Sequence, residues 1–219
     1  MTGAATSFNE NGQPCTLELT NCTVAANHSQ TGAGVLRNGG NDLVLKNTIV
    51  WGNSNAIELL SSAAATVTYS DIQGGYSGTG NLNKNPKFID LPNFDTAPTT
   101  VGDFHVHNCS FTTDVGTATG APDTDLSGNP RPVSGAFDLG VYEVQTPFTA
   151  TRLYVKANAS GMNNGLSWAN ALTDLNHALE MSAGCPSIGE VWVGAGTYFP
   201  AADATHNYTP ADPRTKSFA

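Results

Sequence analysis

The sequence is poor in charge, and the charge it has is mostly negative. Only 12% of its 219 residues are charged, about half the share found in an average globular domain. Its nine Lys and Arg are outnumbered by eighteen Asp and Glu, and the basic residues form no cluster. This pattern argues against nucleic acid and anionic membrane surfaces as partners.

Long apolar runs and metal-binding spacings are also missing. No apolar stretch approaches the roughly 20 residues of a membrane-spanning helix, so membrane insertion is not expected. The first 30 residues lack the basic start and apolar core of a secretory signal. The four cysteines form no C-x-x-C pair, which argues against a zinc site. Cys15 and Cys22, the only close pair, are interpreted as small buried residues or as a bridge between neighbouring turns.

Apolar residues and asparagines in one segment return at a constant offset of 26 residues. The matched positions are Leu17 and Leu43, Leu19 and Leu45, Asn21 and Asn47, Val24 and Val50, and Asn27 and Asn53. A weaker third copy lies 22 residues further on and contains Val67, Tyr69 and Ile72. A period in the twenties built from short β-type segments indicates a solenoid.

Three segments carry the strand pattern of this repeat. Residues 15–23, 42–51 and 65–73 alternate apolar and polar side chains and are bounded by Gly or Asn. The sequence therefore predicts an all-β, right-handed parallel β-helix. In it Leu19, Leu45 and Val67 would form an apolar ladder, and Asn21 and Asn47 an amide ladder at a corner.

The remaining sequence predicts shorter elements. Residues 83–90 are expected to form a turn followed by a strand, further strands are expected at 103–106, 137–144 and 153–157, and a buried strand at 190–193. Ser167 is placed to cap a helix over residues 168–182, which Gly184 and Pro186 would end. This is the one short capping helix expected in the fold.

Two blocks of the chain resemble a known family. Residues 48–90 and 123–143 (DTDLSGNPRPVSGAFDLGVYE) are similar to the closing coils of bacterial right-handed parallel β-helix surface proteins, which are pectate-lyase-like and of the choice-of-anchor Q type. Residues 153–200, with LYVKANASGMNNGLSWANALTDLNHAL and a terminal GTY, resemble the opening strand, capping helix and first coil of the same family.

The order of these blocks is inverted, because the closing block precedes the opening block. We therefore expect residues 1–146 to be the C-terminal coils and closing block of one β-helix, and residues 147–219 to open a second or permuted module. A junction of tandem modules, one out-of-phase repeat of an array, and a circular permutant all fit this order. The linker from Glu143 to Leu153 is long enough for each of them.

Few residues suggest chemistry. Polysaccharide lyases of this fold place a basic residue beside clustered Asp, and the ladders offer no such cluster, so no catalytic residue is assigned. Asp123, Asp125 and Asn129 have a spacing compatible with calcium or with an Asx-rich turn. Arg131 and Asp138 are expected to form a structural ion pair. His105 and His107, two apart on one strand, have no evident third metal ligand and are expected to face solvent.

Three aromatic residues fall near one side of the predicted stack. Trp51, Tyr69 and Tyr76 could stack on sugar rings or serve core and corner packing equally well. Together these features indicate a non-catalytic extracellular scaffold of a bacterial surface or secreted protein, whose signal and anchor are expected outside this chain. The scaffold would act in adhesion or in contact with polysaccharide or cell-surface glycan. The alternatives are a fragment of a polysaccharide lyase or glycoside hydrolase, and a fibre subunit that self-associates through open β-helix ends.

Overall fold

The computed structural model describes residues 5–7, 16–28, 36–39, 42–54, 57–60, 65–97, 99–146, 148–200 and 212–218. The chain divides into two compact units. Unit 1 comprises residues 1–107 and 111–145, and unit 2 comprises residues 108–110 and 146–219. That they are the closing and opening blocks of two modules stays a prediction.

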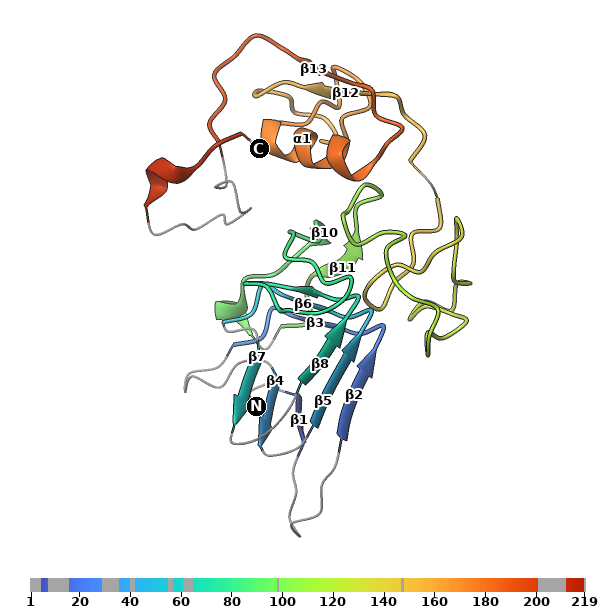
Figure 1. Cartoon of the computed structure of the whole chain (residues 1–219). Coiled ribbons are helices and arrows are strands. Elements are labelled where there is room, and N and C mark those ends of the chain that lie inside the picture. The colour runs from blue at the N-terminus through green and yellow to red at the C-terminus, as the bar shows by residue number, and fades with distance from the viewer. Residues whose placement is uncertain are drawn as a thin grey trace. The chain divides into compact units, whose positions relative to one another are not determined.

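Unit 1 contains three parallel sheets of three strands each (Figure 1). The first is β1 (Ala5–Ser7), β4 (Leu36–Gly39) and β7 (Ile57–Leu60); the second is β2 (Thr16–Thr20), β5 (Asp42–Lys46) and β8 (Ala65–Thr68); the third is β3 (Thr23–Ala25), β6 (Ile49–Trp51) and β9 (Asp71–Ile72). Each sheet takes one strand from each of three successive stretches of the chain. The strands of the second and third sheets overlap the three copies of the sequence pattern, whereas those of the first sheet lie outside these copies.

The register of these strands is the register of the sequence repeat. Leu19 pairs with Leu45 across β2 and β5, and Leu45 pairs with Val67 across β5 and β8. Their side chains lie in one apolar cluster, in which Leu45 is fully buried and Val67 is 2% exposed. The predicted apolar ladder is confirmed, because in-register parallel strands place equivalent residues directly beside one another.

The amide ladder is also present. Asn47 Nδ2 donates to Asn21 Oδ1 at 3.1 Å, and Asn27 Nδ2 donates to Asn53 Oδ1 at 3.2 Å. Asn21 and Asn47 have φ of 49° and 50°, in the left-handed region that Asn tolerates better than most residues. Tyr69 occupies the corresponding position of the third copy at φ 47°.

The all-β, right-handed parallel β-helix predicted for the chain is wrong. The described residues form small sheets of two or three strands, and one of these sheets is antiparallel: β10 (Phe88–Asp90) with β11 (Asp103–Val106). Unit 2 adds a helix between two parallel strands, so the architecture is mixed, and within the described residues no continuous solenoid is indicated. The repeat does not support a solenoid over the whole chain. A sequence repeat predicts the register between neighbouring copies, and it carries no information on segments that lack it.

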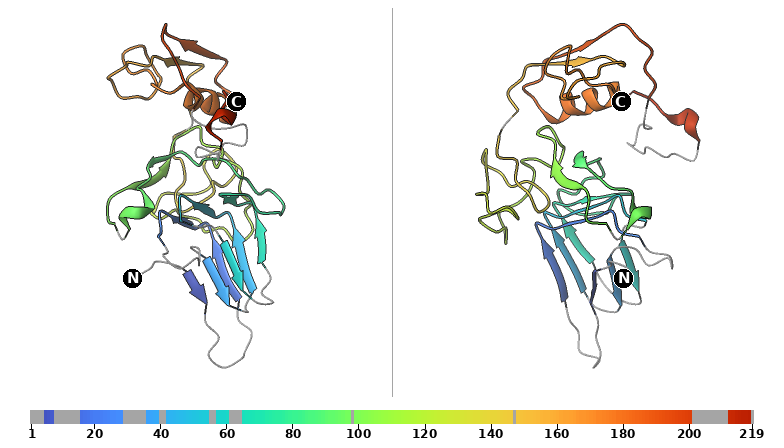
Figure 2. Two further views of the ribbon diagram at one scale, coloured as in Figure 1. Left: turned by 90° about the vertical axis from the view of Figure 1, so that its left-hand side faces the viewer. Right: turned by 180° about the vertical axis from the view of Figure 1, so that it is seen from behind.

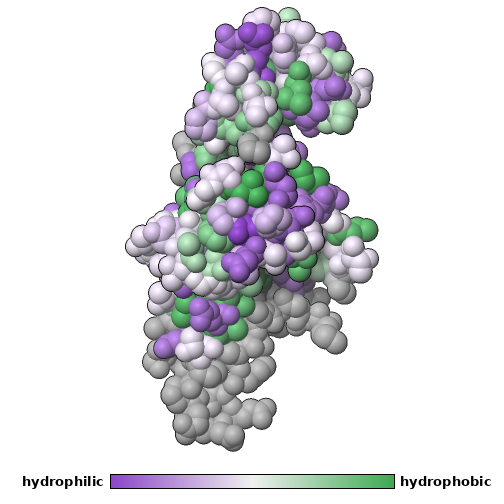
Figure 3. Space-filling model, turned by 90° about the vertical axis from the view of Figure 1, so that its right-hand side faces the viewer, coloured by the Kyte–Doolittle hydropathy of each residue, from purple (hydrophilic) through white to green (hydrophobic). Residues whose placement is uncertain are grey.

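Residues 111–145 close unit 1 mostly with turns. The strand predicted at 137–144 is not formed, and isolated bridges join Thr124 to Pro130 and Val133 to Ala136 instead. A short 3-10 helix, η1 (Phe94–Thr96), precedes β11. Figure 2 shows from two further sides that this part of unit 1 consists largely of loops, and Figure 3 shows polar and apolar residues interspersed on one face.

Unit 2 is built from β12 (Arg152–Val155), α1 (Leu175–Gly184) and β13 (Glu190–Val193). The two strands pair in parallel with α1 between them in the sequence, and η2 (Pro213–Thr215) follows β13. The helix predicted at 168–182 therefore has a different start. Asp174 is its N-cap and accepts the Asn176 N–H at 2.8 Å, whereas Ser167 Oγ accepts the Asn170 N–H within a preceding turn.

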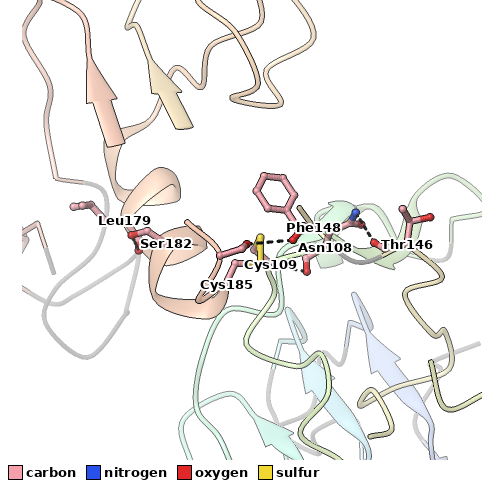
Figure 4. The surroundings of a disulfide bond; sticks show 8 residues. Asn108, Cys109, Thr146, Phe148, Leu179, Ser182 and Cys185 are labelled. Atoms are coloured by element: carbon pink, nitrogen blue, oxygen red, sulfur yellow. Dashed lines mark hydrogen bonds between the residues drawn. A yellow bond between two sulfur atoms is a disulfide. The ribbon is translucent and has the colours of Figure 1, made fainter. Parts of the chain in front are cut away.

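A disulfide that the cysteine spacing did not indicate lies in the core of unit 2. Cys109 and Cys185 are joined across 76 residues of sequence, beside Phe148 and Ser182 (Figure 4). The Gly184 backbone approaches the Cys109 carbonyl so closely that a Cβ at Gly184 would lie 2.5 Å from that oxygen. Cys22 is a free, half-buried thiol whose pKa is raised by burial. Cys15 lies outside the described residues.

Candidate functional site

The three aromatic residues suggested for glycan stacking do not share a surface. Trp51 is 7% exposed and packs in a core cluster with Phe88 and Leu139. Tyr69 is half-buried against the same cluster, whereas Tyr76 packs against the cluster that contains the leucine ladder. The structure therefore places them as packing residues of unit 1, because a sugar ring needs an open aromatic face.

The candidate calcium ligands lie in one hydrogen-bonded turn. Asp125 Oδ1 accepts the N–H groups of Ser127 at 2.9 Å and Asn129 at 2.8 Å. Its Oδ2 faces Asn129 Nδ2 and the Glu143 N–H, both at 3.3 Å. Burial opposes ionisation of this carboxyl, but the hydrogen bonds prevail and its pKa lies below its usual range.

A cation would therefore have to displace protein donors from Asp125. Asp123 is exposed, and its carbonyl accepts the Arg131 N–H at 3.0 Å. Among the residues that the structure describes, no group of three or more His, Cys, Asp or Glu is placed to hold a metal ion. Calcium binding by this turn stays a prediction, and the geometry supports the Asx-rich turn more directly.

A buried charged cluster lies beside this turn. The side chains of Arg131 and Glu143 are each 1% exposed, with Arg131 Nε 3.3 Å from Glu143 Oε2, at ion-pair distance but without hydrogen-bond alignment. Arg131 Nη2 donates to the Gly140 carbonyl at 3.1 Å. The ion-pair partner of Arg131 is thus Glu143 rather than the predicted Asp138. Burial raises the pKa of Asp138 to about 7, although its carboxylate accepts two backbone N–H groups.

This cluster fastens residues 111–145 to the amide ladder. Asn21 Nδ2 donates to the Asp138 carbonyl at 3.0 Å. Asn47 exchanges two hydrogen bonds with the Thr117 backbone, at 2.7 and 2.8 Å. Because the charged groups are buried and their oxygens accept backbone N–H groups, they hold the loops in place and offer no open surface to a substrate.

His105 of β11 and His107, which directly follows this strand, have different surroundings. His105 Nδ1 lies 2.6 Å from Asp103 Oδ1, and its ring stacks on Tyr142 at 3.7 Å between centroids. The His107 backbone N–H donates to the Lys87 carbonyl. Burial of the His107 imidazole, aided by the nearby Lys87 charge, lowers the pKa of this side chain. The prediction that both histidines face solvent is therefore confirmed only for His105, which is exposed.

An exposed aromatic cluster lies in unit 2, where the sequence did not suggest a site. Tyr154 is at its centre, with the Trp168 ring 5.0 Å away and the Trp192 ring 5.9 Å away, both edge-on. Trp168 is 43% exposed and Trp192 is 44% exposed. Two half-exposed tryptophans that share one tyrosine neighbour form an amphipathic surface of the kind that binds ligands. We call these residues, with Arg152 and Glu190, the aromatic platform.

Two charged side chains complete the aromatic platform. The Arg152 guanidinium lies 3.8 Å from the centroid of the Trp192 ring, and its Nε lies 2.6 Å from Glu190 Oε2. Trp192 Nε1 donates to the same carboxylate oxygen at 3.0 Å. The hydrogen bond from Arg152 lowers the pKa of Glu190, so this carboxylate is ionised and oriented at neutral pH.

The register of two strands creates the platform. Arg152 pairs with Glu190, and Tyr154 pairs with Trp192, so both pairs lie on one face of the two-stranded sheet. Leu153 and Val155 alternate with them on the opposite face, where both are fully buried. The turn before α1 adds Trp168.

The sequence prediction missed this site for two reasons. It treated residues 190–193 as a buried strand, whereas three of the four residues are exposed. It also assigned Trp168 to the first turn of the helix. An Arg-x-Tyr and a Glu-x-Trp, each at the spacing of one strand face, were the available signal.

Comparison with known proteins gives no match: no family model, curated protein or solved structure is similar to this chain. The resemblance to bacterial surface proteins therefore stays a prediction. None of the described helices has the length and apolarity needed to cross a membrane.

Proposed function

We propose that this chain is part of a non-catalytic extracellular protein of a bacterial surface, and that it contacts carbohydrate through the aromatic platform. The observation that carries this proposal is the pair of half-exposed tryptophans, Trp168 and Trp192, held around Tyr154. Aromatic rings present apolar faces to the C–H groups of sugars, while neighbouring polar groups bond to hydroxyls.

The two charges give the platform polar recognition. Glu190 accepts hydrogen bonds from Arg152 and from the Trp192 indole, and the Arg152 guanidinium, a hydrogen-bond donor, lies over the Trp192 ring. Among the residues that the structure describes, one carboxylate, that of Glu190, is seen to contact these rings, whereas glycoside hydrolysis ordinarily uses two that flank the scissile bond. This arrangement favours binding over hydrolysis.

The disulfide supports an extracellular location. Cys109 and Cys185 are 3% and 8% exposed in the core of unit 2. Disulfides form and persist in secreted and surface proteins and are rare in the reducing cytosol. The low charge and polar composition of the chain suit the same setting.

The experiment is a binding screen of the whole chain against neutral and acidic polysaccharides, by glycan array and then by titration calorimetry. Trp168→Ala and Trp192→Ala should each weaken binding to the selected glycan by about tenfold or more, equal to about 1.4 kcal/mol. Phe199→Ala is the matched control, because Phe199 is an 80% exposed aromatic residue of unit 2 outside the aromatic platform.

Two outcomes would overturn the proposal. One is that none of the polysaccharides binds the intact chain. The other is that Phe199→Ala weakens binding as much as the tryptophan variants do. Thermal unfolding of each variant, followed by far-ultraviolet circular dichroism, separates loss of the platform from loss of folding.

A further inference from the structure

Strands β2 and β3 lie at the edge of their sheets. In the order β2-β5-β8 and β3-β6-β9, each pairs on one side only among the described residues. Asn21 N–H donates to Lys46 O, and Ala26 N–H donates to Trp51 O, so these residues face the sheet. Because backbone groups alternate along a strand, Glu18 and Thr23 direct their N–H and C=O groups to the open side.

The apolar ladder is incomplete at this edge. Leu43 and Leu45 of β5 are 1% and 0% exposed, because β2 and β8 cover them on both sides. Leu17 and Leu19, the equivalent residues of β2, are only partly buried and pack against the same cluster. One more rung with apolar residues in the same register would bury them further.

A groove lies beside β3. It has a volume of about 300 Å³ and is lined by strand residues and by apolar side chains of later segments: Thr23, Val24, Ala25, Asn27, Phe104, Leu126, Val141 and Tyr142. Leu126 is 69% exposed at its rim. The three residues of β3 are half-buried, and this groove with its apolar lining lies beside them.

The opposite edge shows how such an edge is covered in this protein. Leu82 forms a parallel bridge with Asp71 of β9. The Ile72 N–H donates to the Leu82 carbonyl at 3.0 Å, and the Leu82 N–H donates to the Ser70 carbonyl at 2.8 Å. An extended segment of this chain thus supplies the missing hydrogen bonds of β9, and within the described residues β2 and β3 have no counterpart to it.

We propose that the open edge of β2 and β3 binds an extended segment of a different polypeptide, which adds as a parallel strand. The recognised segment would carry apolar residues at alternate positions followed by Asn, as the repeat of this chain does. Main-chain hydrogen bonds would supply affinity, and the half-buried Leu17 and Leu19 would supply specificity.

A second copy of this chain fits the edge less well. A head-to-tail copy would have to offer the opposite edge, which Leu82 occupies at β9. An antiparallel copy of β2 would bring Glu18 near its own equivalent, and like charges on facing strands repel. This interaction is independent of the aromatic platform, since all of its residues belong to unit 1.

The test uses a fluorescent peptide with the sequence of residues 42–53 and the intact chain, measured by fluorescence anisotropy. In the native pair of β2 and β5 the leucine amides of β2 face the partner strand, so the leucine amides of the peptide should face β2. A peptide N-methylated at the positions of Val44 and Lys46 keeps this side free and should bind. Its isomer N-methylated at the positions of Leu43 and Leu45 should bind at least about tenfold more weakly.

The protein variants form a matched pair at one position. Glu18→Pro removes the open-side N–H without removing a ladder hydrogen bond, and it should weaken peptide binding by about tenfold. Glu18→Ala keeps the N–H and should bind as the parent chain does. Equal binding of the two peptide isomers, or equal binding by the two variants, would overturn the proposal. So would a concentration-dependent dimer in sedimentation that Glu18→Pro abolishes, because the occupant would then be a second copy.

Discussion

Removal of the disulfide should destabilise unit 2 and leave unit 1 largely intact. The bond closes a loop of 76 residues, and closing a loop of that length removes denatured-state entropy worth about 4.5 kcal/mol. If unit 1 stays folded, residues 111–145 are held, and the flexible part of the loop shrinks to about 40 residues, from 145 to 185. The same relation then gives about 4 kcal/mol.

This value is large for a unit of this size. In a domain of about 60 to 100 residues each kcal/mol moves the melting temperature by about 4 to 8 °C, so a shift of about 15 to 30 °C is expected. Reduction of the parent chain and the double substitution Cys109→Ala/Cys185→Ala should lower the melting temperature of unit 2 by similar amounts, because both remove the same constraint. The two values should differ only by the cost of the small cavities that the alanines leave.

The assay is thermal unfolding followed by tryptophan fluorescence in a Trp51→Phe background. Trp51 is the one tryptophan of unit 1, so the remaining signal comes from Trp168 and Trp192 of unit 2. Cys22→Ala is the control, since Cys22 is a free thiol in unit 1. The reasoning is refuted if reduction leaves the unit 2 transition within about 3 °C of its oxidised value, or if Cys22→Ala reproduces the effect.

Two further predictions concern unit 1. Asn47→Ala removes three hydrogen bonds of a fully buried amide and should lower the free energy of unfolding by about 3 kcal/mol in urea titrations. Asn47→Gly controls for backbone strain, because glycine accommodates the left-handed φ. A loss below about 1 kcal/mol in both variants would contradict the role of the amide. Burial, opposed by the Lys84 N–H, raises the pKa of Asp71 to about 7. The neutral form of Asp71 is therefore favoured in the folded state. Its contribution to the free energy of unfolding is fully present below about pH 4 and is lost as the pH rises through about 7. Relative to Asp71→Asn, the parent chain should lose up to about 1.4 kcal/mol per pH unit across that window, and parallel curves for the two proteins would show that Asp71 ionises normally.

The sequence repeat predicted strand pairing in unit 1 residue by residue. The 26-residue offset matches Leu19 with Leu45 and Val24 with Val50, and both pairs are Cα partners across parallel strands. This worked because equivalent residues of neighbouring copies experience the same geometry, so selection for one ladder leaves a periodic trace. The extension of that ladder to the whole chain failed, since residues beyond Gly74 carry no such trace.

Helix limits and exposure were harder to predict. Ser167 and Asp174 are both good N-cap residues, and local preference cannot choose between them. The helix begins after Asp174 because Leu172 forms a parallel bridge with Val155, with its N–H donating to the Tyr154 carbonyl at 2.9 Å, so the residues just before Asp174 are held outside the helix. Likewise Glu190-Val-Trp-Val has the pattern of a buried strand, but its outer face is left open in unit 2 and becomes part of the aromatic platform.

By itself the sequence determined the low charge, the register of β2, β5 and β8, and the amide ladder of Asn21 and Asn47. These features depend on residue type and spacing, which are written directly in the chain. The tertiary structure decided the Cys109–Cys185 pairing, the burial of Arg131 with Glu143, and the assembly of Tyr154, Trp168 and Trp192. Each of these joins residues that share no periodicity, and their proximity depends on how loops of unlike length fold back on the strands.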